Sequence, residues 1–253
     1  MIDYFSILGT TEGLFYLVVL TLLEIVLGID NIIFISIISD KLPKEKQRTA
    51  RNLGLAMALI IRLILLSLVS LIMQMTEPIF TFLGRDFSGQ SLVLLLGGLF
   101  LIYKSTKEMS AIVKGEHHES SAKQSSKMGN VIFQIILIDI VFSFDSIITA
   151  IGMTNEIGHG DPKNHPMVII VGAVIISMIV MMLFSGVIAK FINARPTIKM
   201  LALAFLVTIG VILIAESFGQ EIPKGYIYFA MCYALIVEML NIRMRKNKGR
   251  VEE

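Results

Sequence analysis

Charged residues are scarce in this sequence, and most of them lie between long apolar runs. They make up 17% of the 253 residues, while hydrophobic residues make up 55%. Ordinary soluble domains carry about 25% charged residues. Together with a mean hydropathy of +0.78, this composition excludes an ordinary soluble protein and predicts a membrane protein.

The sequence has a single cysteine and no tryptophan. The one cysteine, Cys232, lies in an apolar stretch, so an intrachain disulfide is excluded and the thiol is expected to pack as a small hydrophobic group. Without tryptophan, tyrosines must provide the aromatic side chains at the membrane–water interfaces. The candidates are Tyr4, Tyr16, Tyr103, Tyr226 and Tyr228.

Two sequence motifs are also missing. The chain has no GxxxxGK[ST] phosphate-binding loop, which excludes ATP hydrolysis at such a loop as an energy source. The first residues, MIDYFSILGTTEG, carry no basic cluster, and no small-residue cleavage site follows the first apolar run. We therefore expect no cleavable signal peptide.

Seven apolar runs dominate what is present. Each approaches the roughly 20 residues that a helix needs to cross the hydrocarbon core, where the backbone must satisfy its own hydrogen bonds. We predict an all-α membrane protein with seven transmembrane helices. The spans are expected near residues 12–38, 50–75, 90–104, 128–153, 166–191, 198–217 and 225–243.

One long polar segment, residues 105–127, divides the chain. We expect it to be a cytoplasmic loop between a first three-helix repeat (1–104) and a second three-helix repeat (128–217). Residues 218–253 would then hold the seventh helix and a basic cytoplasmic tail. Because each half has an odd number of spans, the two halves would be inverted repeats.

The basic residues predict the orientation. Most of the 22 lysines and arginines fall in segments on one side of the predicted spans, while the other side carries only Arg85, Lys163 and Lys224. The positive-inside rule then places the N-terminus outside and the C-terminus in the cytoplasm of the cell (inner) membrane. The tail RMRKNKGR is expected to contact membrane lipid rather than nucleic acid.

Acidic residues occur where charge is costly, and they occur twice. EIVLGIDNII, beginning at Glu24, aligns without a gap with DIVFSFDSII, beginning at Asp139. A charged residue at the centre of a membrane helix costs about 2.5–3.5 kcal/mol, and short aspartate side chains cannot reach the lipid surface from the midplane. Inverted repeats that meet at a midplane site are a recurring transporter architecture.

Helix geometry predicts how these residues would meet. A rise of about 1.5 Å per residue in antiparallel helices gives one layer of Glu24 with Asp145 and another of Asp30 with Asp139, so four carboxylates would converge. However, residues six apart differ by about 240° around a straight helix. Convergence would need a loosened backbone, with the break at Gly28 in the first repeat and Ser143 in the second.

The chemistry around these acids suits a hard cation. Asn31, Ser146 and nearby hydroxyls add oxygen ligands, and no cysteine or histidine lies close in sequence. All-oxygen sites favour Mn²⁺, Mg²⁺ or Ca²⁺ over Zn²⁺ or Cu⁺. Arg62, within the second span, must have an acidic partner. It is expected either to tie helices together or to balance the acids when the site is empty.

These motifs, with the later segment ILIAESFGQEIPKGYIYFAMCYALIVEMLN, resemble the TerC family of integral membrane proteins from about Gly13 to Asn241. The resemblance implies efflux of metal ions, chiefly manganese. This sequence departs from the family pattern at Gly28, where a serine is expected. One possible oxygen ligand is therefore missing. The implied metal ligands are Glu24, Asp30, Asn31, Asp139, Asp145 and Ser146.

Three functions remain open from the residues. A secondary transporter would export the divalent cation as substrate, with exchange for protons as the driving force, because protons compete with metals for carboxylates. An intramembrane aspartyl enzyme needs two carboxylates sharing one proton, which two separated pairs beside Asn and Ser fit less well, so we expect no enzyme. An accessory membrane protein would deliver metal to other membrane or exported proteins. The oligomeric state is left open.

Weaker candidates lie elsewhere in the chain. Glu216 ends the sixth span, and Glu238 with Asn241 ends the seventh. A structural role is favoured for all three over a secondary cation site. His117 and His118, in the polar segment, are expected to be solvated loop residues rather than metal ligands.

Overall fold

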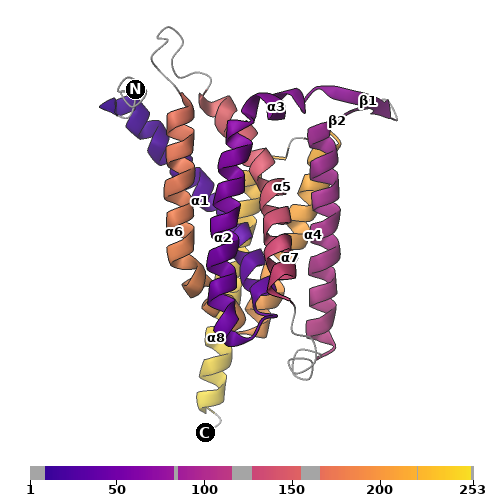
Figure 1. Ribbon diagram of the computed structural model, residues 1–253. Helices are drawn as coiled ribbons and strands as arrows, with labels where there is room; N and C mark the ends of the chain where they lie inside the picture. Colours follow the sequence, from indigo (N-terminus) through magenta and orange to yellow (C-terminus); the bar gives the residue numbers. More distant parts are fainter. Residues whose placement is uncertain (1–8, 83–84, 116–126, 155–165, 221, 252–253) are drawn as a thin grey trace.

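The computed structural model describes residues 9–82, 85–115, 127–154, 166–220 and 222–251 (Figure 1). Seven of its helices are long and apolar enough to cross a membrane, which confirms the predicted fold class for the part of the chain described. They are α1 (Thr11–Ser39), α2 (Lys44–Ser67), α4 (Gly89–Val113), α5 (Met128–Thr154), α6 (Pro166–Asn193), α7 (Pro196–Ser217) and α8 (Lys224–Val251).

Several helix ends follow from local chemistry. At the start of α1, Thr10 Oγ1 accepts a hydrogen bond from the Gly13 N–H at 3.0 Å, and Ser88 caps α4 in the same way. Pro196 begins α7, where its missing N–H has no cost. Gly219 follows α7 with φ of 72°, a left-handed conformation that glycine adopts readily and that ends the helix.

The second span differs from the prediction. Helix α2 ends at Ser67, and the apolar residues that follow form the short helix α3 (Val69–Gln74) and then the antiparallel strands β1 (Pro78–Phe82) and β2 (Arg85–Ser88). In this hairpin the Phe80 and Phe87 rings stack at 5.4 Å, and Phe87 also contacts Phe218 at 5.5 Å. Apolar composition therefore continues past the end of α2, because Ile72 of α3 and Phe87 of the hairpin are buried in the core.

The predicted 105–127 loop is also too long. Helix α4 continues to Val113, because Ser105 and Glu108 are buried and Glu108 forms an ion pair with Lys41. Residues 116–126, including His117 and His118, lie outside the described part of the chain.

The helices form one bundle in which the halves interleave. Helix α1 packs mainly against α6, α2 against α5, and α4 against α7. At the α4–α7 crossing, a Cβ added to Gly98 would lie 2.6 Å from the Gly210 carbonyl oxygen, so the two backbones touch. The first helix of each half thus pairs with the second helix of the other. This exchange favours the inverted repeat, which stays a prediction.

Helix α8 stands at the side of this arrangement and packs chiefly against α7. Many of its large side chains are exposed, Tyr226, Phe229 and Tyr233 among them. Cys232 is exposed as well, so the expectation that it packs as a small hydrophobic residue is wrong. The reason is that this face of α8 has no helix against it in the part of the chain described.

The two ends of the bundle differ. The hairpin end carries β1, β2 and the start of α1, while α8 finishes at the opposite end, which we call the tail end (Figure 1). Because α7 ends beside β2, as the Phe87–Phe218 contact shows, α8 runs from the hairpin end to the tail end.

Candidate cation site

The predicted site residues come from two helices that cross inside the bundle. Helix α1 provides Glu24, Asp30 and Asn31, and helix α5 provides Asp139 and Ser146. Each of these five residues is buried, with at most 4% of its surface exposed. Asp145 lies in α5, but its side chain falls outside the described part of the structure.

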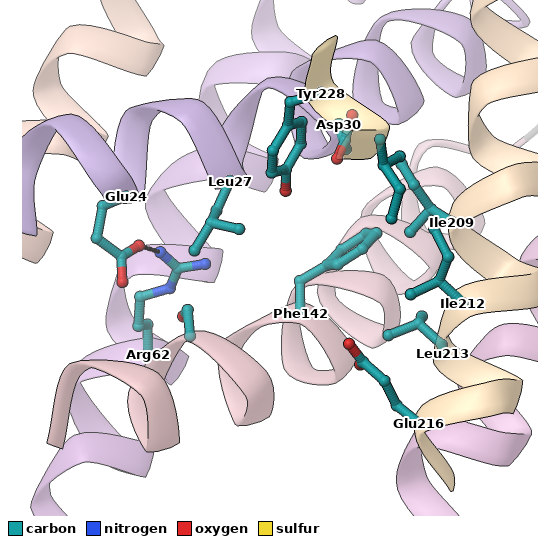
Figure 2. Close-up of a pocket in the computed structure, with 12 residues that line it drawn as sticks. Glu24, Leu27, Asp30, Arg62, Phe142, Ile209, Ile212, Leu213, Glu216 and Tyr228 are labelled. Atoms are coloured by element: carbon teal, nitrogen blue, oxygen red, sulfur yellow. Dashed lines mark hydrogen bonds and ion pairs between the residues drawn. The ribbon is translucent and has the colours of Figure 1, made fainter. Parts of the chain in front are cut away.

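Arg62 of α2 compensates two of the acids. Its Nη1 donates to Glu24 Oε2 at 2.5 Å, its Nη2 donates to Asp139 Oδ1 at 3.3 Å, and its Nε donates to Ser143 Oγ at 3.0 Å. Figure 2 shows the guanidinium beside the Glu24 carboxylate. The expected acidic partner is thereby confirmed, and the ion pairs tie α1, α2 and α5 together.

A second set of hydrogen bonds surrounds Asp139. Asn31 Nδ2 donates to Asp139 Oδ1 at 3.2 Å, and Ser143 Oγ donates to Asp139 Oδ2 at 3.2 Å. Asp139 therefore lies beside Asn31, and through Arg62 it also lies close to Glu24, which the predicted layers had separated from it. The Asn31 side-chain oxygen is buried and has no hydrogen-bond partner among the described residues.

Asp30 faces a different environment. It lines a cavity of about 40 Å³ together with Ser146, Glu216 and Tyr228, and its Oδ1 is buried without a hydrogen-bond partner in the described structure. In Figure 2 the Asp30 carboxylate and the Tyr228 hydroxyl both lie at the edge of this space, with Phe142 across from them. Since one water needs about 10–15 Å³ by this measure, the cavity has room for a cation and one or two waters.

The predicted break in the helices is wrong. Residues on both sides of Gly28 are helical, as are those around Ser143. Glu24 and Asp30 nevertheless line the same cavity, so an interruption is not needed for both acids to reach it. Gly28 instead marks a close helix contact, because a Cβ there would lie 2.3 Å from Met181 Sδ of α6.

The predicted convergence of four carboxylates is not found among the described side chains, where no three Asp, Glu, His or Cys residues gather into a metal-holding group. Glu24 and Asp139 are turned toward Arg62, whereas Asp30 faces the cavity. The reason is electrostatic: carboxylates that approach one another in a low dielectric repel strongly unless a cation lies between them.

Two residues that line the cavity are not predicted as site residues from the sequence. The sequence favours a structural role for Glu216, at the end of α7, and predicts Tyr228 of α8 as an interface aromatic. The signal for Glu216 was its place after the apolar run ILIA. No comparable signal marked Tyr228, because its role depends on how α8 packs. Glu238 and Asn241 do not line this cavity.

Comparison with known proteins gives a consistent result. The model of the family described as "Integral membrane protein TerC family" matches residues 9–253. A UPF0053 protein of Haemophilus influenzae is 48% identical over 243 residues, which cover 96% of this chain and 98% of that protein. The UPF0053 inner membrane protein YgdQ of Escherichia coli K12 is 46% identical over 90% of this chain and 92% of its own length.

Longer relatives also match. The UPF0053 inner membrane protein YoaE of Escherichia coli K12 is 44% identical over 91% of this chain, which corresponds to 43% of YoaE. No solved structure matches the chain. The fold and the site described above therefore rest on this chain's own structure.

Proposed function

Because the chain belongs to the TerC family of integral membrane proteins, we propose that it is a secondary transporter that exports divalent metal ions, Mn²⁺ foremost, from the cytoplasm. The membrane is proposed to be the inner membrane, since two of the relatives above are named inner membrane proteins. The orientation follows the positive-inside rule, with the N-terminus outside and the C-terminus in the cytoplasm.

The observation that carries this proposal is Asp30. It is a carboxylate 2% exposed, it faces a cavity, and one of its oxygens has no partner in the described structure. An ionised group held this way in a bilayer is costly and marks a substrate or ion pathway. A purely structural acid would be paired, as Glu24 is with Arg62.

The donor atoms define the class of substrate. Asp30, Asn31 and Ser146 offer carboxylate, amide and hydroxyl oxygens, which hard divalent cations prefer. The oxygen donors admit Mn²⁺, Mg²⁺ and Ca²⁺ alike, and manganese is the choice that the TerC resemblance implies. The metal is substrate here, so the site must release it as well as bind it.

Arg62 supplies the balancing charge between transport steps. Its guanidinium forms ion pairs with both Glu24 and Asp139. An arriving cation competes with Arg62 for these carboxylates, so Asp30 would bind first and the other two would follow as Arg62 withdraws. Because carboxylates must be deprotonated to bind metal, protons entering from outside would promote release and serve as counter-ions.

Transport in inverted membrane vesicles tests the proposal. In these vesicles the cytoplasmic face points outward, so export appears as Mn²⁺ uptake. We expect uptake with the wild type, its loss with Asp30→Asn, and wild-type uptake with the matched control Glu12→Gln, which removes an exposed carboxylate from the same helix. Normal transport by Asp30→Asn would contradict the proposed site.

The accessory role makes a different prediction. If the protein only delivers metal to other proteins, wild-type vesicles will accumulate no Mn²⁺ while the purified protein still binds it. Loss of the acids would then leave partner binding intact. We keep this alternative for that outcome.

A further inference from the structure

A second and larger cavity lies directly beside the first. It has a volume of about 860 Å³, and it shares Leu27, Glu216 and Tyr228 with the cavity around Asp30. These three residues therefore form a partition between the two spaces. The larger cavity also has polar groups along its wall, which include Gln90, Thr149 and Gln220.

The larger cavity belongs to the hairpin end of the bundle. Gln90 is in the first turn of α4, directly after β2, and its backbone N–H donates to the Met75 carbonyl oxygen at 3.0 Å. Gly219 and Gln220 follow the end of α7. By the distribution of basic residues this end faces outward, so we call the larger cavity the outer vestibule.

The tail end is closed by contrast. Every residue of α1 from Asp30 to Ser39 is buried, with Ile32, Phe34 and Ile37 exposed by only 2% each. Both cavities take their α1 residues from Leu22 to Asp30 only. Tight apolar packing thus separates Asp30 from the tail end.

Ion pairs reinforce that closure. Lys199 Nζ at the start of α7 donates to Asp40 Oδ2 at 2.8 Å, and Lys41 pairs with Glu108 of α4. Together the two pairs, which we call the tail-end lock, hold the end of α1 to α4 and α7. The asymmetry of packing and charge makes the structure outward-open.

The partition carries the chemistry that a departing cation needs. In Figure 2 the Glu216 carboxylate and the Tyr228 hydroxyl point into the cavity from opposite sides. Leu27, the third residue that lines both cavities, offers no side-chain ligand to a divalent cation that leaves Asp30. The Glu216 and Tyr228 oxygen atoms along the partition could replace water ligands during the passage.

We propose that Glu216 and Tyr228 form a second cation station, through which a divalent cation passes from the Asp30 cavity into the outer vestibule. This inference rests on the proposed transport function and adds the exit route to it. Glu216 supplies a negative charge beyond the first site, so the cation is never left without a carboxylate before it reaches water.

Thiol labelling tests the vestibule without requiring transport. In a Cys232→Ser background, Thr149→Cys places a thiol in the vestibule. Ile64→Cys places a control thiol at an exposed apolar position of α2, away from both cavities. We expect a membrane-impermeant reagent added to intact cells to label Thr149→Cys but not Ile64→Cys. Because only a thiolate reacts, a thiol that contacts lipid should stay unlabelled by permeant and impermeant reagents alike.

Two labelling outcomes would overturn the proposal. If Thr149→Cys stays unlabelled by the impermeant reagent from either side of the membrane, the vestibule holds lipid rather than water. If the impermeant reagent reaches it only in inverted vesicles, the vestibule opens to the cytoplasm and cannot be an exit. Both outcomes are readable even if the wild type moves no Mn²⁺, so failure of the vestibule is distinguishable from failure of the transport function.

Transport and binding measurements test the station itself. We expect Glu216→Gln to lower the maximal rate of Mn²⁺ uptake at least about tenfold while equilibrium binding of Mn²⁺ to the purified protein changes little, because Asp30 remains. Tyr228→Phe should lower the rate by a smaller factor. The control Glu238→Gln removes a carboxylate of α8 that lines neither cavity and should transport normally.

The pattern of effects separates the station from the first site. Asp30→Asn should abolish binding as well as transport, whereas Glu216→Gln should affect transport alone. Wild-type uptake rates in both Glu216→Gln and Tyr228→Phe would overturn the second station. Loss of Mn²⁺ binding in Glu216→Gln would also overturn it, because Glu216 would then belong to the first site.

Discussion

Arg62 is the residue on which the charge balance of the bundle interior depends. It is 2% exposed and contacts Glu24, Asp139 and Ser143. Removing one partner of a buried ion pair costs about 3–5 kcal/mol because the remaining charge is uncompensated. We therefore predict that Arg62→Leu strongly lowers the thermal stability of the protein in detergent.

The control for this prediction removes the stranded charges as well. Arg62→Leu combined with Glu24→Gln and Asp139→Asn should recover part of the lost stability, measured by thermal unfolding of the same purified proteins. If the triple variant is no more stable than Arg62→Leu, packing of the arginine side chain rather than its charge explains the loss.

Asp30 and Glu24 should behave in opposite ways when each is made neutral. Glu24 is paired with Arg62, so Glu24→Gln should lower stability. Asp30 keeps one buried oxygen without a partner in the described structure, so Asp30→Asn should leave stability unchanged or raise it while abolishing Mn²⁺ binding. Thermal unfolding and equilibrium Mn²⁺ binding, measured side by side, check both. A loss of stability in Asp30→Asn would indicate that Asp30 has a structural role instead.

At the scale of elements, close helix contacts depend on glycines. A Cβ at Gly28 would lie 2.3 Å from Met181 Sδ, the flexible side chain of another helix, whereas a Cβ at Gly98 would lie 2.6 Å from the Gly210 backbone oxygen. Overpacking of this kind costs about 1–3 kcal/mol. We predict that both Gly28→Ala and Gly98→Ala lower the unfolding temperature.

Only one of the two should be correctable. Met181→Ala opens space next to Gly28, so the Gly28→Ala, Met181→Ala double variant should be more stable than the sum of the single losses implies. No side chain can be shortened to relieve Gly98→Ala, because the obstacle is backbone. Additive losses in the Gly28 pair would contradict the contact.

The helices themselves could be predicted from the sequence, because an apolar run of membrane length has few other structures available to it. The ends of α1, α6 and α7 lie close to their predicted bounds, whereas the ends of α2 and α4 do not. The hairpin after α2 and the extension of α4 to Val113 depend on tertiary contacts, such as the Phe87 rings and the Lys41–Glu108 pair. Hydropathy carries no information about such partners.

The site was predictable to the same degree. Glu24, Asp30 and Asp139 stood out because charge is rare in an apolar run, and a partner for Arg62 was expected for the same reason. The pairing of Glu24 and Asp139 with one arginine, and the turning of Asp30 to a cavity, depend on how five helices pack. Tyr228 lines the cavity through the position of α8, which lies outside the predicted repeats.

At the scale of the whole molecule, the tail-end lock should hold the outward-open arrangement. Lys199 and Asp40 are partly accessible, with side-chain exposures of 10% and 31%, so each pair contributes modestly. We predict that Asp40→Asn combined with Glu108→Gln shifts the population toward inward-open molecules and slows labelling of Thr149→Cys from outside several-fold. A separate variant with the charges of this pair exchanged, Asp40→Lys with Lys199→Asp, keeps the ion pair. It should be labelled at the wild-type rate.

The lock would be refuted as a gate in one case. If the combined variant is labelled from outside at the wild-type rate and takes up Mn²⁺ normally, the two ion pairs only stabilise helix ends. Higher salt should also weaken the pairs in the wild type, because partly exposed charges are screened.

Helix α8 packs chiefly against α7 and yet contributes Tyr228 to both cavities. Helix α8 therefore adds contacts chiefly to the second predicted repeat (128–217), which contains α7. Two repeats with identical contacts would give two conformations of equal energy when they exchange their arrangements. If the proposed transport proceeds by exchange between the two predicted repeats, α8 would make the two conformations unequal in energy before any ion binds.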